Sequence, residues 1–250
     1  MSEQKPNLQE SAEWLAMEDF SAGIDTNRLP QTDELAGSIH TVALAGGGEA
    51  RFEFLPGQQV SWTVSGLEWA GSGTDGYDGV KVGDGAYWVD LSISERKVES
   101  LTLVFQPVSG WALIVHSVIH GENFTTETRV MQTFHPGRVD GNATVELPEE
   151  TRDLIGKRTL FRYSVNHLYE HIYLSSRRFL WHNLVGEQRG HAAAELATTW
   201  KLEDGLYVFT WREEKIPVGT VFVFDYARGR STGKFIGLTS DGRIENSQGG

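Results

Sequence analysis

The chain has 250 residues, of which 39 % are hydrophobic and 22 % charged, and its formal net charge is -12. It contains no cysteine, which excludes disulfides, thiolate nucleophiles and cysteine-ligated zinc or iron–sulfur sites. A chain this acidic repels phosphate backbones and anionic lipids, so we expect neither nucleic acid nor membrane as a partner.

Residues 1–33 form a predicted N-terminal arm. A short helix is predicted over Glu10–Phe20, with Trp14, Leu15 and Met17 roughly on one side. The arm lacks the basic and then apolar pattern of a signal peptide, and no apolar run in the chain reaches the roughly 18 residues of a membrane span. We therefore expect a cytoplasmic protein.

From Glu34 onward the sequence is typical of β-strands. Short runs rich in Val, Phe, Tyr, Trp and Thr alternate with Gly, Asp and Asn turns at hairpin spacing. Helical periodicity is confined to the arm and to a weak stretch over Pro148–Asp153, so the predicted fold class is all-β. The strand candidates are ARFEFLP, QVSWTVSG, GAYWVDLSI, SLTLVFQP, WALIVHSVI, TLFRYSV, YEHIYLS, RRFLWHNL, LYVFTWRE, GTVFVFDY and GKFIGLTS.

The β-rich part contains an internal repeat. Gly156 lies 119 residues after Gly37, within the similar stretches DLIG and ELAG. Any two β-meanders share an alternating pattern, but a shared tryptophan, a shared glycine and a shared Asp-Gly turn near one register indicate a duplication. The matched positions are Gly37 with Gly156, Phe54 with Tyr173, Trp62 with Trp181, and Asp84 and Gly85 with Asp204 and Gly205.

The repeat divides the chain into two predicted domains, residues 34–138 and 150–250. The boundary is expected in the polar segment 139–150. Each repeat has room for about six to eight short antiparallel strands. Closing such a sheet removes its exposed edges, and an eight-stranded barrel encloses about one small ligand. The sequence therefore predicts two tandem lipocalin-like antiparallel β-barrels behind a short helical arm.

Candidate chemistry lies in the second repeat. Tyr207, Phe209, Trp211 and Glu213 share one face of a predicted strand. If that face lines the barrel, a carboxyl group ends an apolar pocket, where burial raises its pKa and suits it to proton transfer. The alternative is a charge at the barrel mouth, in solvent. The matching position in the first repeat is Ile93, which cannot run the same chemistry.

Histidines are also concentrated in the second repeat. Imidazole is a common metal ligand, but only His167 and His171 are close in the sequence, and they lie across a turn-to-strand junction. We therefore expect no metal site and no cofactor. The second-repeat histidines are His167, His171, His182 and His191.

Long segments of the chain resemble the molybdenum cofactor biosynthesis protein F (MoaF) family. The C-terminal resemblance runs through DLIGKRTLFRYSVNHLYEHIYLSSRRFLWHNLVGEQRG and LEDGLYVFTWREEKIPVGTVFVFDYARGRSTGKFIG. The N-terminal resemblance runs through LPQTDELAGSIHTVAL and DGAYWVDL, and together they cover nearly all of residues 29–247. The resemblance implies no settled reaction, and none of these residues indicates a pterin or molybdenum.

The second repeat also resembles phenolic acid decarboxylases, which are single lipocalin-like barrels. Gly156 matches that family's glycine, Tyr163 its second pocket tyrosine and Tyr169 the first residue of its Tyr-Glu pair. Trp211 and Glu213 match its W-x-E strand. The resemblance implies that Glu213 handles a proton and that Tyr163 grips the substrate.

Two positions depart from that pattern. Phe161 replaces the first pocket tyrosine, and His191 stands at the place of the essential arginine, with Arg189 two residues earlier on the same predicted strand parity. Loss of the guanidinium weakens any grip on a carboxylate. This disfavours a plain phenolic acid decarboxylase, whereas a histidine–glutamate pair in an aromatic pocket suits proton shuttling.

The leading hypothesis is a cofactor-independent lyase or isomerase that acts on a small organic substrate, aromatic or acidic, inside the second barrel. Its reaction would be an isomerisation, epimerisation, dehydration or decarboxylation. The rival is a non-catalytic binding protein for a small hydrophobic ligand, and a dimerisation role of the first barrel leaves a homodimer open. The predicted catalytic residues are Glu213, His191 and Tyr163, and the predicted substrate-binding residues are Tyr169, His171, Trp181, Arg189, Trp211 and Phe161.

Overall fold

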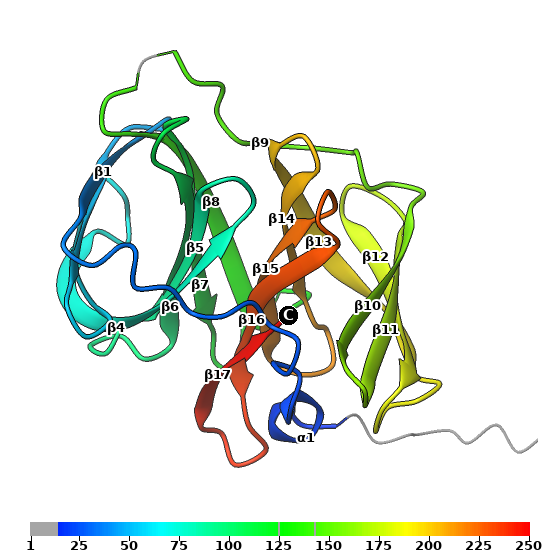
Figure 1. The fold of residues 1–250 in the computed structure, drawn as a ribbon. Coiled ribbons are helices and arrows are strands. Elements are labelled where there is room, and N and C mark those ends of the chain that lie inside the picture. The colour runs from blue at the N-terminus through cyan, green and yellow to red at the C-terminus, as the bar shows by residue number, and fades with distance from the viewer. Residues whose placement is uncertain (1–14, 125, 143) are drawn as a thin grey trace, which may run out of the picture.

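The computed structural model describes residues 15–124, 126–142 and 144–250. The first half of the chain is a closed antiparallel barrel whose strands pair in chain order, the first with the last. Figure 1 shows this barrel beside a second curved sheet. Its strands are β1 (Ile39–Leu44), β2 (Glu49–Leu55), β3 (Gln59–Ser65), β4 (Gly71–Val82), β5 (Ala86–Ser92), β6 (Glu99–Gln106), β7 (Trp111–Ile119) and β8 (Val130–Val139).

The second half is another curled antiparallel sheet with strands in chain order, so the prediction of two tandem β-barrels is confirmed. Among the described residues its first and last strands do not pair, which leaves this second barrel with one open seam. Its strands are β10 (Arg158–Ser164), β11 (His167–Tyr173), β12 (Arg178–Val185), β13 (Ala192–Glu203), β14 (Leu206–Arg212), β15 (Val218–Asp225), β16 (Arg230–Leu238) and β17 (Ile244–Gly249). The short strand β9 (Glu149–Glu150) pairs with β13, where the weak helical stretch was expected.

The two halves share local geometry as well as strand order, as the predicted duplication requires. Gly37 and Gly156 adopt φ of +84° and +83°, a region in which glycine alone is unstrained. The Gly37 N–H donates to Phe54 O at 2.7 Å, and the Gly156 N–H donates to Tyr173 O at 2.9 Å. These partners are the pair that the sequence spacing matched.

Each sheet encloses an apolar core, and a further core lies between the barrels. Trp88, Val104 and Leu113, on the outer faces of β5, β6 and β7, belong to one cluster with Val208 and Val221 on β14 and β15. Every residue of β15 is buried, because one face lines its own barrel and the other packs toward the neighbouring barrel. Burial on both faces explains its continuous apolar run.

A buried ion pair crosses the contact between the barrels. Lys234 on β16 is fully buried and donates to Asp90 on β5 and to Ser100 Oγ, the latter at 2.7 Å. Asn246 Nδ2 also donates to Asp90, at 2.7 Å. Burial lowers the pKa of Lys234, and the Asp90 carboxylate opposes that change. A buried charge requires its partner, so this pair fixes how the barrels pack.

The arm crosses to the second barrel. Helix α1 (Met17–Ser21) lies below that barrel in Figure 1, and Phe20 and Ile24 are buried in its core. Further along, the Asn27 N–H donates to Tyr163 O on β10 at 3.0 Å, and the Gly250 N–H, just after β17, donates to Ile24 O at 3.4 Å. The arm therefore occupies part of the seam between β10 and β17.

Helix α1 is shorter than expected. It has five residues, and the Glu10–Trp14 part of the predicted helix lies outside the described residues. Met17 and Phe20 stand three residues apart on one face, and that face is buried. In the described part of the chain, no helix has the length and apolarity needed to cross a membrane.

Candidate active site in the second barrel

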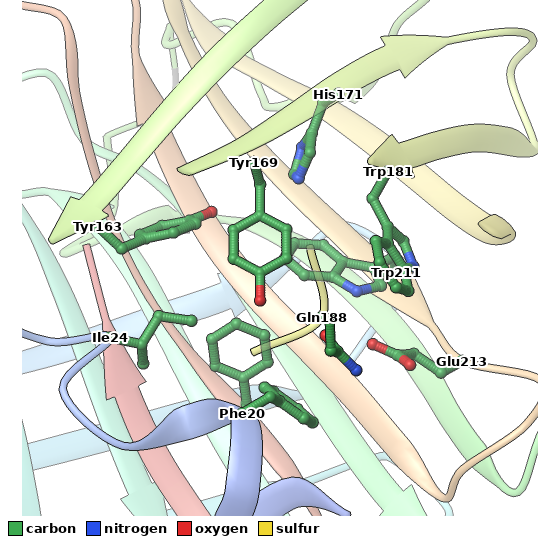
Figure 2. A pocket seen from close by; sticks show the side chains of 10 residues that line it. Phe20, Ile24, Tyr163, Tyr169, His171, Trp181, Gln188, Trp211 and Glu213 are labelled. Carbon is green, nitrogen blue, oxygen red and sulfur yellow. The ribbon is translucent and has the colours of Figure 1, made fainter. Parts of the chain in front are cut away.

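A cavity lies inside the second barrel, next to α1. Its empty volume including the mouth is about 410 Å³, and the centre of a water molecule can occupy about 30 Å³ of it. The smaller value admits only one or two waters, so a larger ligand requires some of the lining side chains to move. The lining residues, most of them labelled in Figure 2, are Phe20, Ile24, Tyr163, Tyr169, His171, Trp181, Gln188, Trp211, Glu213 and Phe235.

Strand β14 directs its aromatic face into this barrel. Tyr207, Phe209 and Trp211 belong to the interior core, whereas Val208 belongs to the core between the barrels. Glu213 continues the interior face beyond the end of β14, and its N–H donates to Val218 O at 2.9 Å across the hairpin. Only 8 % of Glu213 is exposed, and it lines the cavity. Its carboxyl group thus ends an aromatic pocket.

The first barrel has no carboxyl group at the corresponding position. Ile93 is buried there in the interior core, together with Phe52 and Trp62. These three residues correspond to Glu213, His171 and Trp181 of the second barrel. The tryptophan is shared, and the two polar groups are specific to the second copy.

A second carboxyl group lies behind Glu213. The β13–β14 register pairs Leu196 with Arg212, so the next step places Glu195 opposite Glu213. Glu195 is 1 % exposed, and its Oε2 accepts the Glu214 N–H at 2.9 Å. Burial raises the pKa of Glu213 to about 8, and the like charge of Glu195 adds to the effect. Burial likewise raises the pKa of Glu195 to about 7.

Tyrosines and a histidine form the wall contributed by β10 and β11. Burial raises the pKa of Tyr163 far above its ordinary value and that of Tyr169 to about 12, so both phenols are neutral at pH 7. Burial lowers the pKa of His171 to about 3, so its imidazole is uncharged. Among the described residues, Tyr163 Oη and His171 Nδ1 lack hydrogen-bond partners. Such an atom costs about 1–3 kcal/mol when buried, which a bound polar ligand would relieve.

Two predicted site residues lie in a turn outside the cavity. Arg189 is exposed and His191 half-buried, and neither lines the cavity. The Arg189 N–H donates to Gly186 O at 3.1 Å, and the His191 N–H donates to Gln188 O at 2.8 Å. Because this segment is a turn, the alternation expected for a strand does not apply. Gln188 reaches the cavity instead, and Figure 2 shows its amide facing the Glu213 carboxyl group.

Phe161 lies beside the cavity and does not line it. Its ring packs against those of Tyr163 and His171, with centroid distances of 6.1 and 4.7 Å. On its other side it borders a separate groove with Phe224 and Tyr226. Its position supports the wall of the pocket.

The second-repeat histidines do not gather around one point. His167 Nδ1 lies 2.7 Å from Ser164 Oγ, and His182 Nδ1 lies 3.4 Å from Glu170 Oε2. Within the described ranges, no group of three or more His, Cys, Asp and Glu side chains is placed to hold a metal ion.

Comparisons with known proteins agree with the two-part organisation. The model of the MoaF N-terminal domain matches residues 12–121, and the model of the MoaF C-terminal domain matches residues 148–250. Protein MoaF of Klebsiella aerogenes is 37 % identical over 91 residues, which are 36 % of this chain and 35 % of that protein. The match therefore spans about a third of the length of this curated relative. Because the two domain models together cover most of its length, the chain belongs to the MoaF family.

Proposed function

We propose that the chain is an enzyme that moves protons on a small organic molecule bound inside the second barrel. Glu213 is its general acid and base, and the reaction is an isomerisation, epimerisation, dehydration or decarboxylation without a cofactor. The observation that carries the proposal is a buried carboxyl group at the end of an aromatic cavity. A general acid works best when its pKa lies near the operating pH, and burial brings the pKa of Glu213 to about 8.

The proton balance of the proposed step is simple. In an isomerisation or epimerisation, protonated Glu213 gives its proton to one position of the substrate, and the resulting carboxylate takes a proton from another. In a dehydration, the proton goes to the hydroxyl oxygen that leaves as water, and the carboxylate takes a proton from the adjacent carbon. In a decarboxylation, the proton goes to the carbon that loses CO2, and water returns a proton to Glu213. Gln188 and Tyr169, which also line the cavity, orient the substrate by hydrogen bonds. Trp181 and Trp211 form apolar walls that exclude water. The geometry assigns no such role to His191, which does not line the cavity.

Deuterium exchange at carbon tests the proposal whatever the product of the reaction is. Small phenols, ketones and hydroxy acids are incubated with the protein in deuterated water, and exchange is followed by proton NMR. We expect the wild type to exchange at least one compound and Glu213→Gln to lose about 100-fold or more of that rate. Glu122→Gln, a change at an exposed carboxyl group, should retain the full rate.

The non-catalytic alternative gives a different result. A binding protein retains a small ligand in the cavity and catalyses no exchange into it. Saturable binding with no exchange for any compound, or full exchange by Glu213→Gln, would therefore overturn the enzymatic proposal.

A further inference from the structure

The cavity carries polar groups but no built-in positive charge. Neither lysine nor arginine is among the described side chains that line it. The imidazole of His171 is fully enclosed and uncharged at neutral pH, because burial lowers its pKa to about 3. Arg189, the one guanidinium that the sequence placed in the site, is exposed on the turn outside. A bound anion would therefore meet no cation inside the cavity.

The carboxyl groups of Glu195 and Glu213 disfavour the binding of an anion in the cavity. Both Glu195 and Glu213 are buried, and the charged groups that face Glu195 are Arg178, Lys215 and Glu214. Arg178 and Lys215 favour the ionised form of Glu195, as does the N–H that its Oε2 accepts. These partners favour a negative charge on Glu195, next to Glu213, whereas burial and the nearby Glu195 favour the protonated form of Glu213.

Two unsatisfied atoms indicate what the cavity does accept. Tyr163 Oη and His171 Nδ1 are buried without a partner among the described residues, and both residues line the cavity. In Figure 2 their side chains face the same space as the Tyr169 ring. A phenol hydroxyl donates to an acceptor oxygen, so a ligand oxygen placed here satisfies a group that the protein leaves unpaired.

We propose that the ligand of this cavity is a small uncharged molecule, with one apolar ring or short chain and an oxygen that accepts a hydrogen bond from Tyr163. Phenols, ketones and enols belong to this class, and carboxylates are excluded. The inference rests on the proposed function only where it calls this ligand a substrate. The ligand class itself is argued from the residues of the cavity. It keeps the aromatic part of the expected ligand class and removes the acidic part. Decarboxylation, whose substrate is a carboxylate, therefore drops out of the four candidate reactions.

Matched pairs of compounds that differ in charge provide the test. The pairs are 4-methylphenol with 4-hydroxybenzoate, and cyclohexanone with cyclohexanecarboxylate, each titrated at pH 7 against the full chain. Quenching of tryptophan fluorescence reports binding, because Trp181 and Trp211 line the cavity. We expect the neutral member of at least one pair to bind and its carboxylate to bind at least about 100-fold more weakly. Equal affinity within each pair, or no binding of either neutral compound at millimolar concentration, overturns the proposal.

Variants place the binding in this cavity. Tyr163→Phe should weaken the neutral ligand about 10-fold and leave the fold intact, because the lost hydroxyl has no partner among the described residues. Tyr87→Phe, which removes a hydroxyl bound to Glu34 on the first barrel, should not change affinity. Glu195→Gln should strengthen carboxylate binding about 10-fold and leave the neutral ligand unaffected. A carboxylate affinity that does not rise in Glu195→Gln contradicts the charge argument.

The two proposals fail in distinguishable ways. Neutral compounds that bind without any exchange in deuterated water refute catalysis and leave the ligand class standing. Exchange that is confined to carboxylates refutes the ligand class and leaves proton transfer standing.

Discussion

The protonation of Glu213 predicts an unusual dependence of stability on pH. The folded protein holds this proton up to about pH 8, whereas an ordinary glutamate releases it near 4.5. Between these values the folded state binds more protons than the unfolded chain, so stability falls as pH rises through that window and levels off above it. This direction is opposite to that of a carboxylate held in a salt bridge.

The magnitude follows from the size of the pKa change. Each pH unit between 4.5 and about 8 lowers the free energy of unfolding by about 1.4 kcal/mol. Over the whole window the loss is about 5 kcal/mol as an upper bound. Glu213→Gln keeps the shape of the protonated acid and cannot ionise. The variant should therefore lose a few kcal/mol less stability than the wild type between pH 5 and pH 9. Glu195 remains in the variant and preserves part of the fall.

Urea denaturation at pH 5, 7 and 9, followed by tryptophan fluorescence, measures this difference. Glu122→Gln, at an exposed carboxyl group, is the matched control and should follow the wild type at every pH. If wild type and Glu213→Gln lose stability in parallel, Glu213 is ionised in the folded protein and cannot serve as an acid at neutral pH.

Three further predictions about the fold can be tested by urea denaturation. Lys234→Met should lower the free energy of unfolding by about 3–5 kcal/mol because it leaves Asp90 buried and uncompensated. Adding Asp90→Leu should recover part of that loss, and no recovery would contradict the ion-pair argument. Phe20→Ala should cost about 3 kcal/mol by opening a void beneath the second barrel, and a loss below about 0.5 kcal/mol would show that the arm is not docked in solution. Gly156→Ala and Gly37→Ala should each cost about 1–2 kcal/mol through the positive φ, and unequal costs would contradict the equivalence of the two turns.

Much of the fold could be predicted because the residues shared by the two repeats occupy positions that few other residue types can occupy. Gly37 and Gly156 require positive φ, and Trp62 and Trp181 fill equivalent interior positions on β3 and β12. Alternation along β14 also indicated the interior face on which Glu213 continues. Local patterns of this kind survive in a single sequence because the backbone enforces them. The likeness of the second copy to phenolic acid decarboxylases stays a prediction, as does a cytoplasmic location.

Other features depended on contacts that no local pattern reveals. The segment AAAELATTWKLE is composed largely of helix-forming residues, yet it is strand β13, because it pairs with β12 and β14. The sequence did not indicate Glu195 for that reason, because the direction of its side chain is defined only once the segment is known to be a strand. The glycine-rich sequence of β4 is typical of turns, although it forms a strand of twelve residues. His191 was expected in the cavity, but the segment forms a turn, and Gln188 lines the cavity instead.

The docking of the arm sets an order of events during synthesis. Ser21 Oγ lies 3.5 Å from Oγ of Ser247, a residue 226 positions later, and Ile24 accepts a hydrogen bond from Gly250. The arm is made before β17 and Gly250, which follow roughly 10 to 45 seconds later at typical translation rates. Through that interval the apolar side chains of Met17 and Phe20 have no completed barrel to enter. The first barrel can close before β17 is made, whereas the second barrel is complete only when β17 and the much earlier arm have come together.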